Sequence, residues 1–205
     1  MSSHQLKFIR RAAAGITIGR SNSRAVDGTG SSYTIGWAAG GAAANGTWLV
    51  AVVEEATGSG THPYITGGSA WTRLGTTKCY YKQCGASEPT TYTISYAGAS
   101  KGEGSAVAIL EVFGASSVEA TANASSTNAA PSVTTTDAND LIVLGAGNSS
   151  ALGTVTPPTG WTTQTTGSGN AVACLATKLL AGLGSISPGN WNTTYAKLYT
   201  LAFKP

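Results

Sequence analysis

The sequence predicts an all-β protein: an antiparallel β-sandwich of the jelly-roll or immunoglobulin-like type, built from two related halves and preceded by an extended N-terminal arm. The first indication is that short apolar runs alternate with clusters of Gly, Ser and Pro, and that Gly supplies 27 of the 205 residues. The second is that only 10% of the residues are charged, far fewer than a helical protein would carry. The third is an internal repeat.

The internal repeat relates residues 31–114 to residues 130–205. Each copy has an apolar run, a Trp that follows a Gly-containing turn, a run that contains a Cys and a closing apolar run, in the same order and with similar spacing. Such self-similarity indicates a duplicated unit. The repeated tryptophans are Trp71 and Trp161, and we expect both to be buried anchors of the core rather than parts of a ligand platform.

The strands of the two copies can be assigned in order. In the first copy we expect strands at residues 33–37, 48–55, 71–74, 77–83, 91–96 and 106–113. In the second copy we expect them at residues 132–136, 141–146, 161–166, 171–180 and 195–203. The run 48–53 is apolar on both faces, which is typical of a central strand that is covered on both sides. Residues 115–130 are rich in Ala, Ser, Thr and Asn, so we expect a connection that contributes little to a core.

Residues 1–30 are predicted to form a basic arm, with a short strand near residues 16–20, and residues 31–205 to form one sandwich domain. Five bases precede the first acid, Asp27, whereas the rest of the chain has seven bases against nine acids. A short basic segment suits an acidic groove on a neighbouring protein, a nucleic acid or an anionic membrane. The candidate partner-binding residues of the arm are Lys7, Arg10, Arg11, Arg20 and Arg24. No run approaches the roughly 20 apolar residues of a membrane span, so no membrane partner is expected.

Of the three cysteines, Cys79 and Cys174 are expected to be buried thiols, and Cys84 is left unassigned. Cys79 and Cys84 would lie about 16 Å apart in one extended strand, too far for a disulfide unless the strand bends. Cys79 and Cys174 occupy related places in the two copies, where a small buried side chain is the usual explanation. Because the number is odd, at least one thiol is free or bridges to another chain.

The sequence contains no recognisable catalytic, cofactor-binding or metal-binding motif. The two histidines, His4 and His62, are not spaced as metal ligands. Asp137 and Asp140 lack the repeated acid-and-Gly pattern of a calcium loop, and we expect them to form a turn. There is no Gly-x-Ser-x-Gly elbow and no complete Gly-x-Gly-x-x-Gly pattern. We therefore expect no enzymatic activity, no cofactor and no bound metal.

Exposed aromatic rings are the remaining candidates for contact with a ligand. Trp37, Tyr64 and Trp191 lie outside the repeated pair of tryptophans, so the duplication gives them no core role. Amphipathic rings of this kind can stack on the faces of sugars. We expect these three side chains to be exposed.

Several phrases resemble a widespread group of tailed-bacteriophage virion proteins. The phrases are WLVAVV at 48–53, WTRL at 71–74, YYK at 80–82, ASEPTTYTI at 86–94, ANDLIV at 138–143 and PPTGWT at 157–162. Together they span about residues 31–203 and leave the arm unmatched. The resemblance implies a β-sandwich or jelly-roll module of the kind found in capsid decorations, head fibres and tail fibres, and it implies no catalytic residue.

The fold, the arm and the resemblance together predict a non-enzymatic structural protein of the virion, assembled in the cytoplasm of a bacterial host. A capsid-surface decoration or cement protein fits best, because the chain has no fibrous or heptad segment. Its expected partners are the major capsid protein or another virion protein, bound through the arm, and copies of itself in a homo-oligomer. The alternatives are a tail-fibre or neck component and a carbohydrate-binding adhesin module that binds a host glycan. A nucleic-acid partner is not expected.

Overall fold

A computed structural model describes residues 15–27, 32–37, 41–56, 63–75, 77–95, 104–150 and 154–205 of the chain. The described residues form strands and no helix, and every strand pairing is antiparallel. The prediction of an all-β antiparallel sandwich is therefore confirmed. Within these residues no helix is long and apolar enough to cross a membrane. Of the predicted arm residues, Lys7, Arg10 and Arg11 lie outside the described residues, as do His4 and His62.

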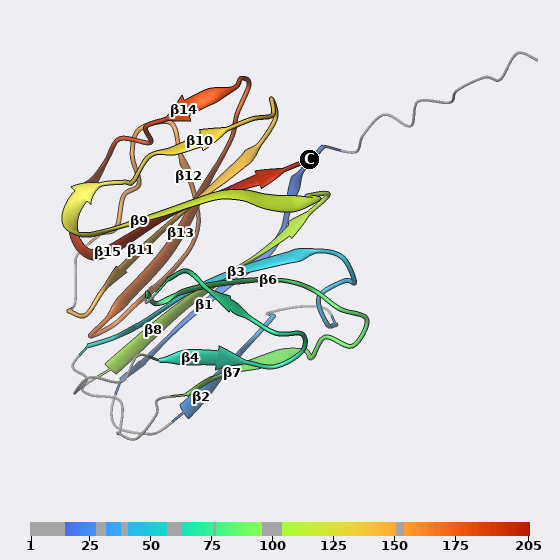
Figure 1. Ribbon diagram of the computed structural model, residues 1–205. Helices are drawn as coiled ribbons and strands as arrows, with labels where there is room; N and C mark the ends of the chain where they lie inside the picture. Colours follow the sequence, from blue (N-terminus) through green and yellow to red (C-terminus); the bar gives the residue numbers. More distant parts are fainter. Residues whose placement is uncertain are drawn as a thin grey trace, which may run out of the picture.

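The first half of the molecule comprises residues 17–113. Its strands are β1 (Thr17–Asp27), β2 (Ser32–Gly36), β3 (Trp48–Glu55), β4 (Tyr64–Thr66), β5 (Thr72–Arg73), β6 (Cys79–Gln83), β7 (Thr91–Ser95) and β8 (Gly104–Phe113). They form a five-stranded sheet in the order β1-β8-β3-β6-β5, the first large sheet, and a three-stranded sheet in the order β2-β7-β4, the first small sheet (Figure 1).

The second half comprises residues 117–204. Its strands are β9 (Ser117–Ala129), β10 (Val133–Thr135), β11 (Leu141–Asn148), β12 (Thr162–Ser168), β13 (Val172–Leu179), β14 (Gly184–Ile186) and β15 (Asn190–Lys204). They form a second large sheet in the order β12-β13-β11-β15-β9 and a second small sheet that pairs β10 with β14.

The two large sheets have the same strand order. Strand β9 takes the place of β1, β15 that of β8, β11 that of β3, β13 that of β6 and β12 that of β5. The registers agree as well. The first residue of β3 pairs with Val112, the second-to-last residue of β8, and the first residue of β11 pairs with Phe203, the second-to-last residue of β15. The strand arrangement thus has the symmetry that the sequence repeat predicted.

Two predicted boundaries are wrong, and in equivalent places. Residues 17–27, expected in the arm, form β1 at the edge of the first large sheet. Residues 117–129, expected to be a connection, form β9 at the equivalent edge of the second. Both strands carry mainly small or polar side chains, so the apolar alternation that marks a half-buried strand is weak in them. They are held instead by backbone pairing to β8 and β15.

The four sheets stack as layers, with the two large sheets inside and a small sheet on each outer side (Figure 1). The central core between the large sheets includes Val50, Leu110, Val143, Leu175, Leu201 and Phe203. The first outer core, under the first small sheet, includes Leu49, Tyr92, Ile94 and Ile109. The second outer core, under the second small sheet, includes Ile142, Leu144, Trp191 and Tyr195. Because both faces of each large sheet are buried, β3 and β11 are apolar throughout most of their length.

The polar strand β1 crosses β12 at one side of the central core. The hydroxyls of Ser21 and Ser23 donate hydrogen bonds to the backbone carbonyls of Gln164 and Thr166, each at 2.9 Å. The strands approach closely at Gly167, where a Cβ would lie 3.0 Å from the carbonyl oxygen of Arg24 in β1. The serines of β1 therefore join the halves by hydrogen bonds where large side chains have no room.

All three cysteines are buried and free, which confirms the prediction for Cys79 and Cys174. Their predicted relation is wrong, however. Cys79 pairs with Val52 and faces the central core, whereas Cys174 pairs with Ala146 and faces the second outer core. Successive residues of a strand point to opposite faces, so a difference of one position in the repeat places the two thiols on opposite sides of their sheets.

Candidate functional site

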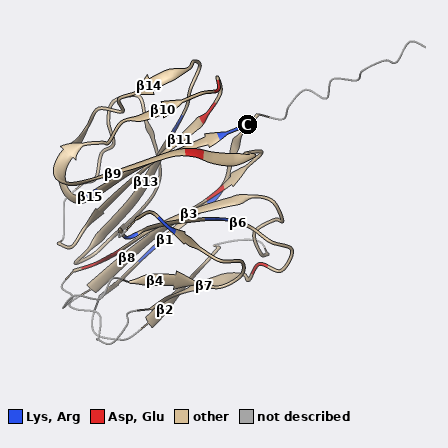
Figure 2. Cartoon of the chain, viewed as in Figure 1, with Lys and Arg blue, Asp and Glu red and all other residues tan. Residues whose placement is uncertain are grey.

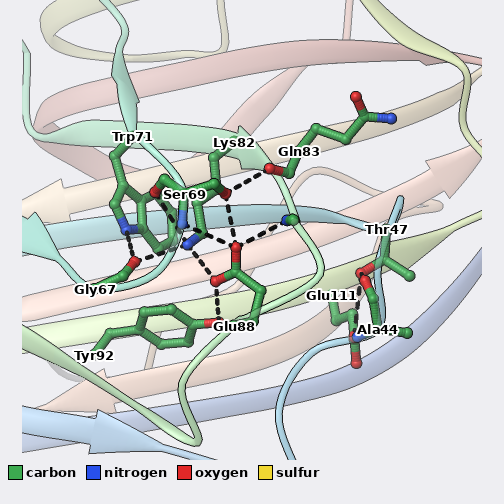
Figure 3. Close-up of polar contacts among 11 residues, drawn as sticks. Ala44, Thr47, Gly67, Ser69, Trp71, Lys82, Gln83, Glu88, Tyr92 and Glu111 are labelled. Atoms are coloured by element: carbon green, nitrogen blue, oxygen red, sulfur yellow. Dashed lines mark hydrogen bonds and ion pairs between the residues drawn. The ribbon is translucent and has the colours of Figure 1, made fainter.

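Charged and aromatic side chains gather at one end of the first outer core (Figure 3). We call the group formed by Ser69, Trp71, Lys82, Glu88 and Tyr92 the lysine cluster. Strand β6 supplies Lys82 and β7 supplies Tyr92, while the turns before β5 and β7 supply the others. Lys82 follows Tyr80 by two positions in β6, so the alternation of the strand directs both side chains into the same core.

Lys82 is only 2% exposed, and its ammonium group is fully occupied. It pairs with Glu88 Oε2 at 2.5 Å and donates hydrogen bonds to the carbonyl oxygens of Gly67 at 2.8 Å and Ser69 at 3.3 Å. An ammonium group has three hydrogens to donate, and three acceptors are present. The buried charge is thus compensated without help from solvent.

Glu88 is 7% exposed and accepts further hydrogen bonds. Its donors are the backbone and hydroxyl of Ser69 at 3.1 and 2.7 Å, the backbone of Gly85 at 3.0 Å and the hydroxyl of Tyr92 at 3.2 Å. Burial by itself raises the pKa of this carboxyl, but the hydrogen bonds from Lys82, Ser69 and Gly85 outweigh burial and lower the pKa to about 2. Glu88 therefore stays ionised and is unsuited to act as a general acid.

Gly68 gives Glu88 the space it occupies. Its φ is +69°, and a Cβ at this position would lie 2.0 Å from Glu88 Oε2. A side chain at residue 68 would meet both a strained backbone and the carboxylate, so the turn before β5 requires glycine here.

Aromatic rings enclose the ammonium group of Lys82. Its nitrogen lies 4.8 Å from the ring centroids of both Trp71 and Tyr92, within the range of cation–π attraction. The two rings meet edge to face with their centroids 5.5 Å apart. Trp37 extends the group, with its ring 6.5 Å from that of Tyr92 and the guanidinium of Arg20 at 4.6 Å above it.

Arg20 links this aromatic row to a second buried acid, Glu111. Its Nε donates to Glu111 Oε2 at 2.7 Å, and the other carboxylate oxygen accepts from the backbone of Ala44 at 3.2 Å and the hydroxyl of Thr47 at 3.3 Å. The terminal nitrogens of Arg20 donate to the backbone carbonyls of residues 41 and 42. Arg20 therefore holds the entry to β3 against β1 and β8.

Arg24 is also bound within the chain. It donates to the carbonyl oxygen of Thr34 at 2.7 Å, and its guanidinium lies 5.8 Å from the ring centroid of Tyr33. The two predicted arm residues that the structure describes, Arg20 and Arg24, thus belong to a strand and serve its own half. The candidate attachment residues that precede β1 are Lys7, Arg10 and Arg11.

The three aromatic side chains that were expected to be exposed differ in their exposure to solvent. Tyr64 is exposed to 42%, as predicted. Trp37 is half-buried beneath Arg20. Trp191 is only 2% exposed, so its assignment as a surface contact is wrong: it packs in the second outer core, edge to face with Tyr195 at 5.4 Å. Its position in β15 points inward because the long strand continues the alternation that buries Tyr195.

The second half has a reduced counterpart of the lysine cluster. Trp161 precedes β12 as Trp71 precedes β5, and Lys178 occupies the position of Lys82, facing the second residue of β11. Lys178 lies 5.9 Å from the Trp161 ring centroid but is exposed, and no carboxylate of the described residues pairs with it. The predicted equivalence of Trp71 and Trp161 is confirmed, although both are half-buried rather than fully buried.

The cluster has the chemistry of a rigid support. Its acid and base neutralise each other, and its remaining polar atoms bind neighbouring backbone. Among the residues that the structure describes, no three His, Cys, Asp or Glu side chains are placed to hold a metal ion. Sequence reasoning identified Trp71 but missed Lys82 and Glu88, although the inward position of Lys82 in the alternation of β6 was a signal that could have revealed the buried pair.

Comparisons with protein-family models, with curated proteins and with solved structures found no match.

Proposed function

We propose that this chain is a non-enzymatic structural protein of a tailed-bacteriophage virion and that it decorates the capsid surface as a cement protein. It attaches to the major capsid protein, or to another virion protein, through the basic residues that precede β1. The observation that supports attachment there is the division of basic charge. Arg20 and Arg24 are bound within the first half, whereas Lys7, Arg10 and Arg11 precede the first strand of the fold.

The ends of the described chain support attachment at one end of the molecule. Strand β1 begins opposite Phe113, the last residue of β8, and the hydroxyl of Ser116 donates to the carbonyl oxygen of Pro205 at 2.9 Å. The start of β1 and the C-terminus therefore lie at the same end (Figure 1). A segment that precedes β1 is joined to the sandwich at this end, which leaves the opposite end free to face away from the particle.

The surface of the described residues suits dense packing beside other copies. Charged side chains are sparse over the strands (Figure 2), and 10% of the chain is charged. Strand β9 is 13 residues long and pairs on one side only among the described strands. Long edges of this kind can pair with another chain, which supports self-association on the particle.

The test is a truncation that lacks residues 1–14 and retains β1. We expect this variant to keep its thermal stability and to lose binding to particles that have been depleted of the protein. Arg10→Glu combined with Arg11→Glu should weaken binding in a salt-dependent way, whereas the control Lys178→Glu, on an exposed side chain, should not. Normal decoration by the truncated protein would contradict attachment through this segment. Recovery of the protein with purified tails instead of heads would favour a tail-fibre or neck component.

A second candidate function is carbohydrate binding by an adhesin module. The observation that favours it is the exposed ring of Tyr64 on β4, in the same half as the partly exposed Trp37 and Trp71. Host glycans stack on such rings. Binding to a glycan array that is lost in Tyr64→Ala, with unchanged stability, would support this function, and an array without binding would exclude the glycans it carries.

A further inference from the structure

A buried acid with little hydrogen bonding lies where β9, the loop from β10 to β11 and the end of β15 meet. Asp140 directly precedes β11 and is 0% exposed. Neither oxygen of its carboxyl group has a hydrogen-bond partner of normal geometry, and a hydrogen bond from the backbone of Asp137 only partly offsets the effect of burial on its pKa. A buried carboxylate with so little hydrogen bonding is strongly destabilising, so its protonation state requires explanation.

The neighbour of Asp140 is a second acid, Glu119 of β9. Both oxygens of Glu119 are used as acceptors: one accepts from the backbone N–H of Thr136 at 3.0 Å and the other from its hydroxyl at 2.7 Å. Thr136 lies four residues before Asp140 and holds Glu119 beside the loop that carries Asp140. A hydrogen bond between the two carboxyl groups raises the pKa of Asp140 and lowers that of Glu119. Two ionised carboxylates cannot donate to each other, and one proton between them supplies the missing donor.

We propose that Glu119 and Asp140 form a proton-binding site in which Asp140 carries the proton and donates it in a hydrogen bond to ionised Glu119. The donors from Thr136 fix Glu119 as the acceptor, and the complete burial of Asp140 fixes it as the neutral partner. The shared proton ties β9 to the start of β11. The site is a proton site rather than a metal site, because no group of three potential metal ligands occurs among the described residues.

The other charged groups around Asp140 are Asp137 in the same loop and Lys204 at the end of β15, which pair with each other at 2.5 Å. Burial is the main cause that raises the pKa of Asp140, to about 7; the hydrogen bond and charge of Glu119 and the charge of Asp137 add to it, and a hydrogen bond from the backbone of Asp137 opposes it. For Glu119, burial is the largest single cause and raises the pKa, but the hydrogen bonds from Thr136 and Asp140 and the charge of Lys204 together lower it overall. The two shifts have the opposite signs that one shared proton requires.

The sign of the pH dependence follows from these shifts. The pKa of Asp140 is higher in the folded protein, about 7, than its ordinary value of 3.8, so the folded state holds the proton more tightly than the unfolded state. The stability that the site contributes is complete below about pH 3.8 and is lost as the pH rises to about 7. At higher pH Glu119 and Asp140 are both ionised and repel each other, and the loop at residues 136–140 is expected to open.

The test compares thermal and urea unfolding of the wild type with that of Asp140→Asn between pH 4 and pH 8. The Asn amide is a permanent donor to Glu119, so the variant should lack the pH dependence of the site. Across this range the unfolding equilibrium constant of the wild type should rise on the order of 500-fold more than that of the variant. The control Asp137→Asn removes the charge of a half-buried acid three residues away and should keep most of the wild-type profile.

Direct titration keeps the proposal testable if Asp140→Asn does not fold. Carboxyl carbon NMR of the wild type should show Asp140 titrating near neutral pH, and hydrogen exchange at residues 136–140 should accelerate above that pH beyond its intrinsic dependence. In Glu119→Gln the new amide can donate to ionised Asp140, so the pKa of Asp140 should fall by at least about one unit relative to the wild type. Titration of Asp140 near its ordinary pKa, or the same pH profile in wild type and Asp140→Asn, would overturn the proposal.

Discussion

The two halves of the molecule use different polar interactions at equivalent positions of the fold, just before β3 and just before β11. In the first half, Thr47 directly precedes β3 and Arg20 lies in an irregularity of β1, and both bind Glu111. In the second half, Asp140 directly precedes β11 and Glu119 lies at the irregularity of β9. The first position is held by the ion pair of Arg20 and Glu111, and the second is held, on our proposal, by a proton shared between Glu119 and Asp140.

The buried lysine shows a second difference. Lys82 and Lys178 occupy equivalent places, yet Lys82 lies between two rings and pairs with Glu88, whereas Lys178 is exposed beside a single ring. The three-stranded small sheet of the first half supplies Tyr92 from β7, and the turn before β7 supplies Glu88. The comparison teaches that strand order is shared by the halves, whereas burial of a charge depends on what the outer layer contributes.

Among the variants that test this comparison, Glu88→Gln is expected to lose the most stability. The change leaves the ammonium of Lys82 buried without a countercharge, and removal of one partner of a buried ion pair costs about 3–5 kcal/mol. The matched change in the second half, Lys178→Met, affects an exposed side chain and should stay within about 0.5 kcal/mol. Chemical denaturation of both variants measures the difference, and similar values for the two would show that the buried pair does not distinguish the halves.

Acid is expected to destabilise the first half by protonating Glu88. The pKa of Glu88 is lowered in the folded protein, from 4.5 to about 2, so its contribution is present above about pH 4.5 and is lost as the pH falls to about 2. We expect a loss on the order of 2–3 kcal/mol over this range in the wild type. The loss should be absent in Glu88→Gln, as measured by urea unfolding at each pH. The direction is opposite to that of Asp140, whose contribution declines as the pH rises.

The tryptophan pair offers a smaller contrast. Large-to-small changes at fully buried aromatic sites cost about 3–5 kcal/mol, and both Trp71 and Trp161 are half-buried. We expect Trp161→Ala to cost about 2 kcal/mol and Trp71→Ala about 1 kcal/mol more, because the latter also uncovers Lys82. Thermal unfolding of the two variants measures both costs. An unchanged melting temperature in Trp161→Ala would contradict its place beside the second outer core.

The smallest effect concerns the cysteines, which differ in the core they occupy. Burial raises the pKa of Cys79 strongly and that of Cys174 to about 11, so little thiolate is present in the folded protein at neutral pH. We expect slow labelling of both by a thiol reagent under native conditions and rapid labelling after denaturation, with no loss of stability from adding a reductant. Rapid native labelling of either residue, or a dimer that reductant dissociates, would contradict their burial.

The sequence alone determined the fold class, the duplication and most strands of the cores. Apolar runs such as residues 48–53 and 141–146 locate central strands because burial on both faces requires apolar side chains at every position. The tertiary structure decided the roles of β1 and β9, whose small and polar side chains carry little local signal, since edge strands are fixed by pairing with β8 and β15. It also decided which side of a sheet each residue faces, and this separates Cys79 from Cys174.

The polar sites likewise depended on contacts between distant segments. The composition revealed nine acids and twelve bases, but not that Glu111 binds Arg20 across 91 positions of the chain. The sequence predicts that Asp140 forms a turn, and the structure shows a buried acid in a loop that contacts Glu119 of β9 and Lys204 of β15. Local sequence sets the alternation of a strand, whereas the dielectric environment and the partners of a charge are set by the layers that pack above it.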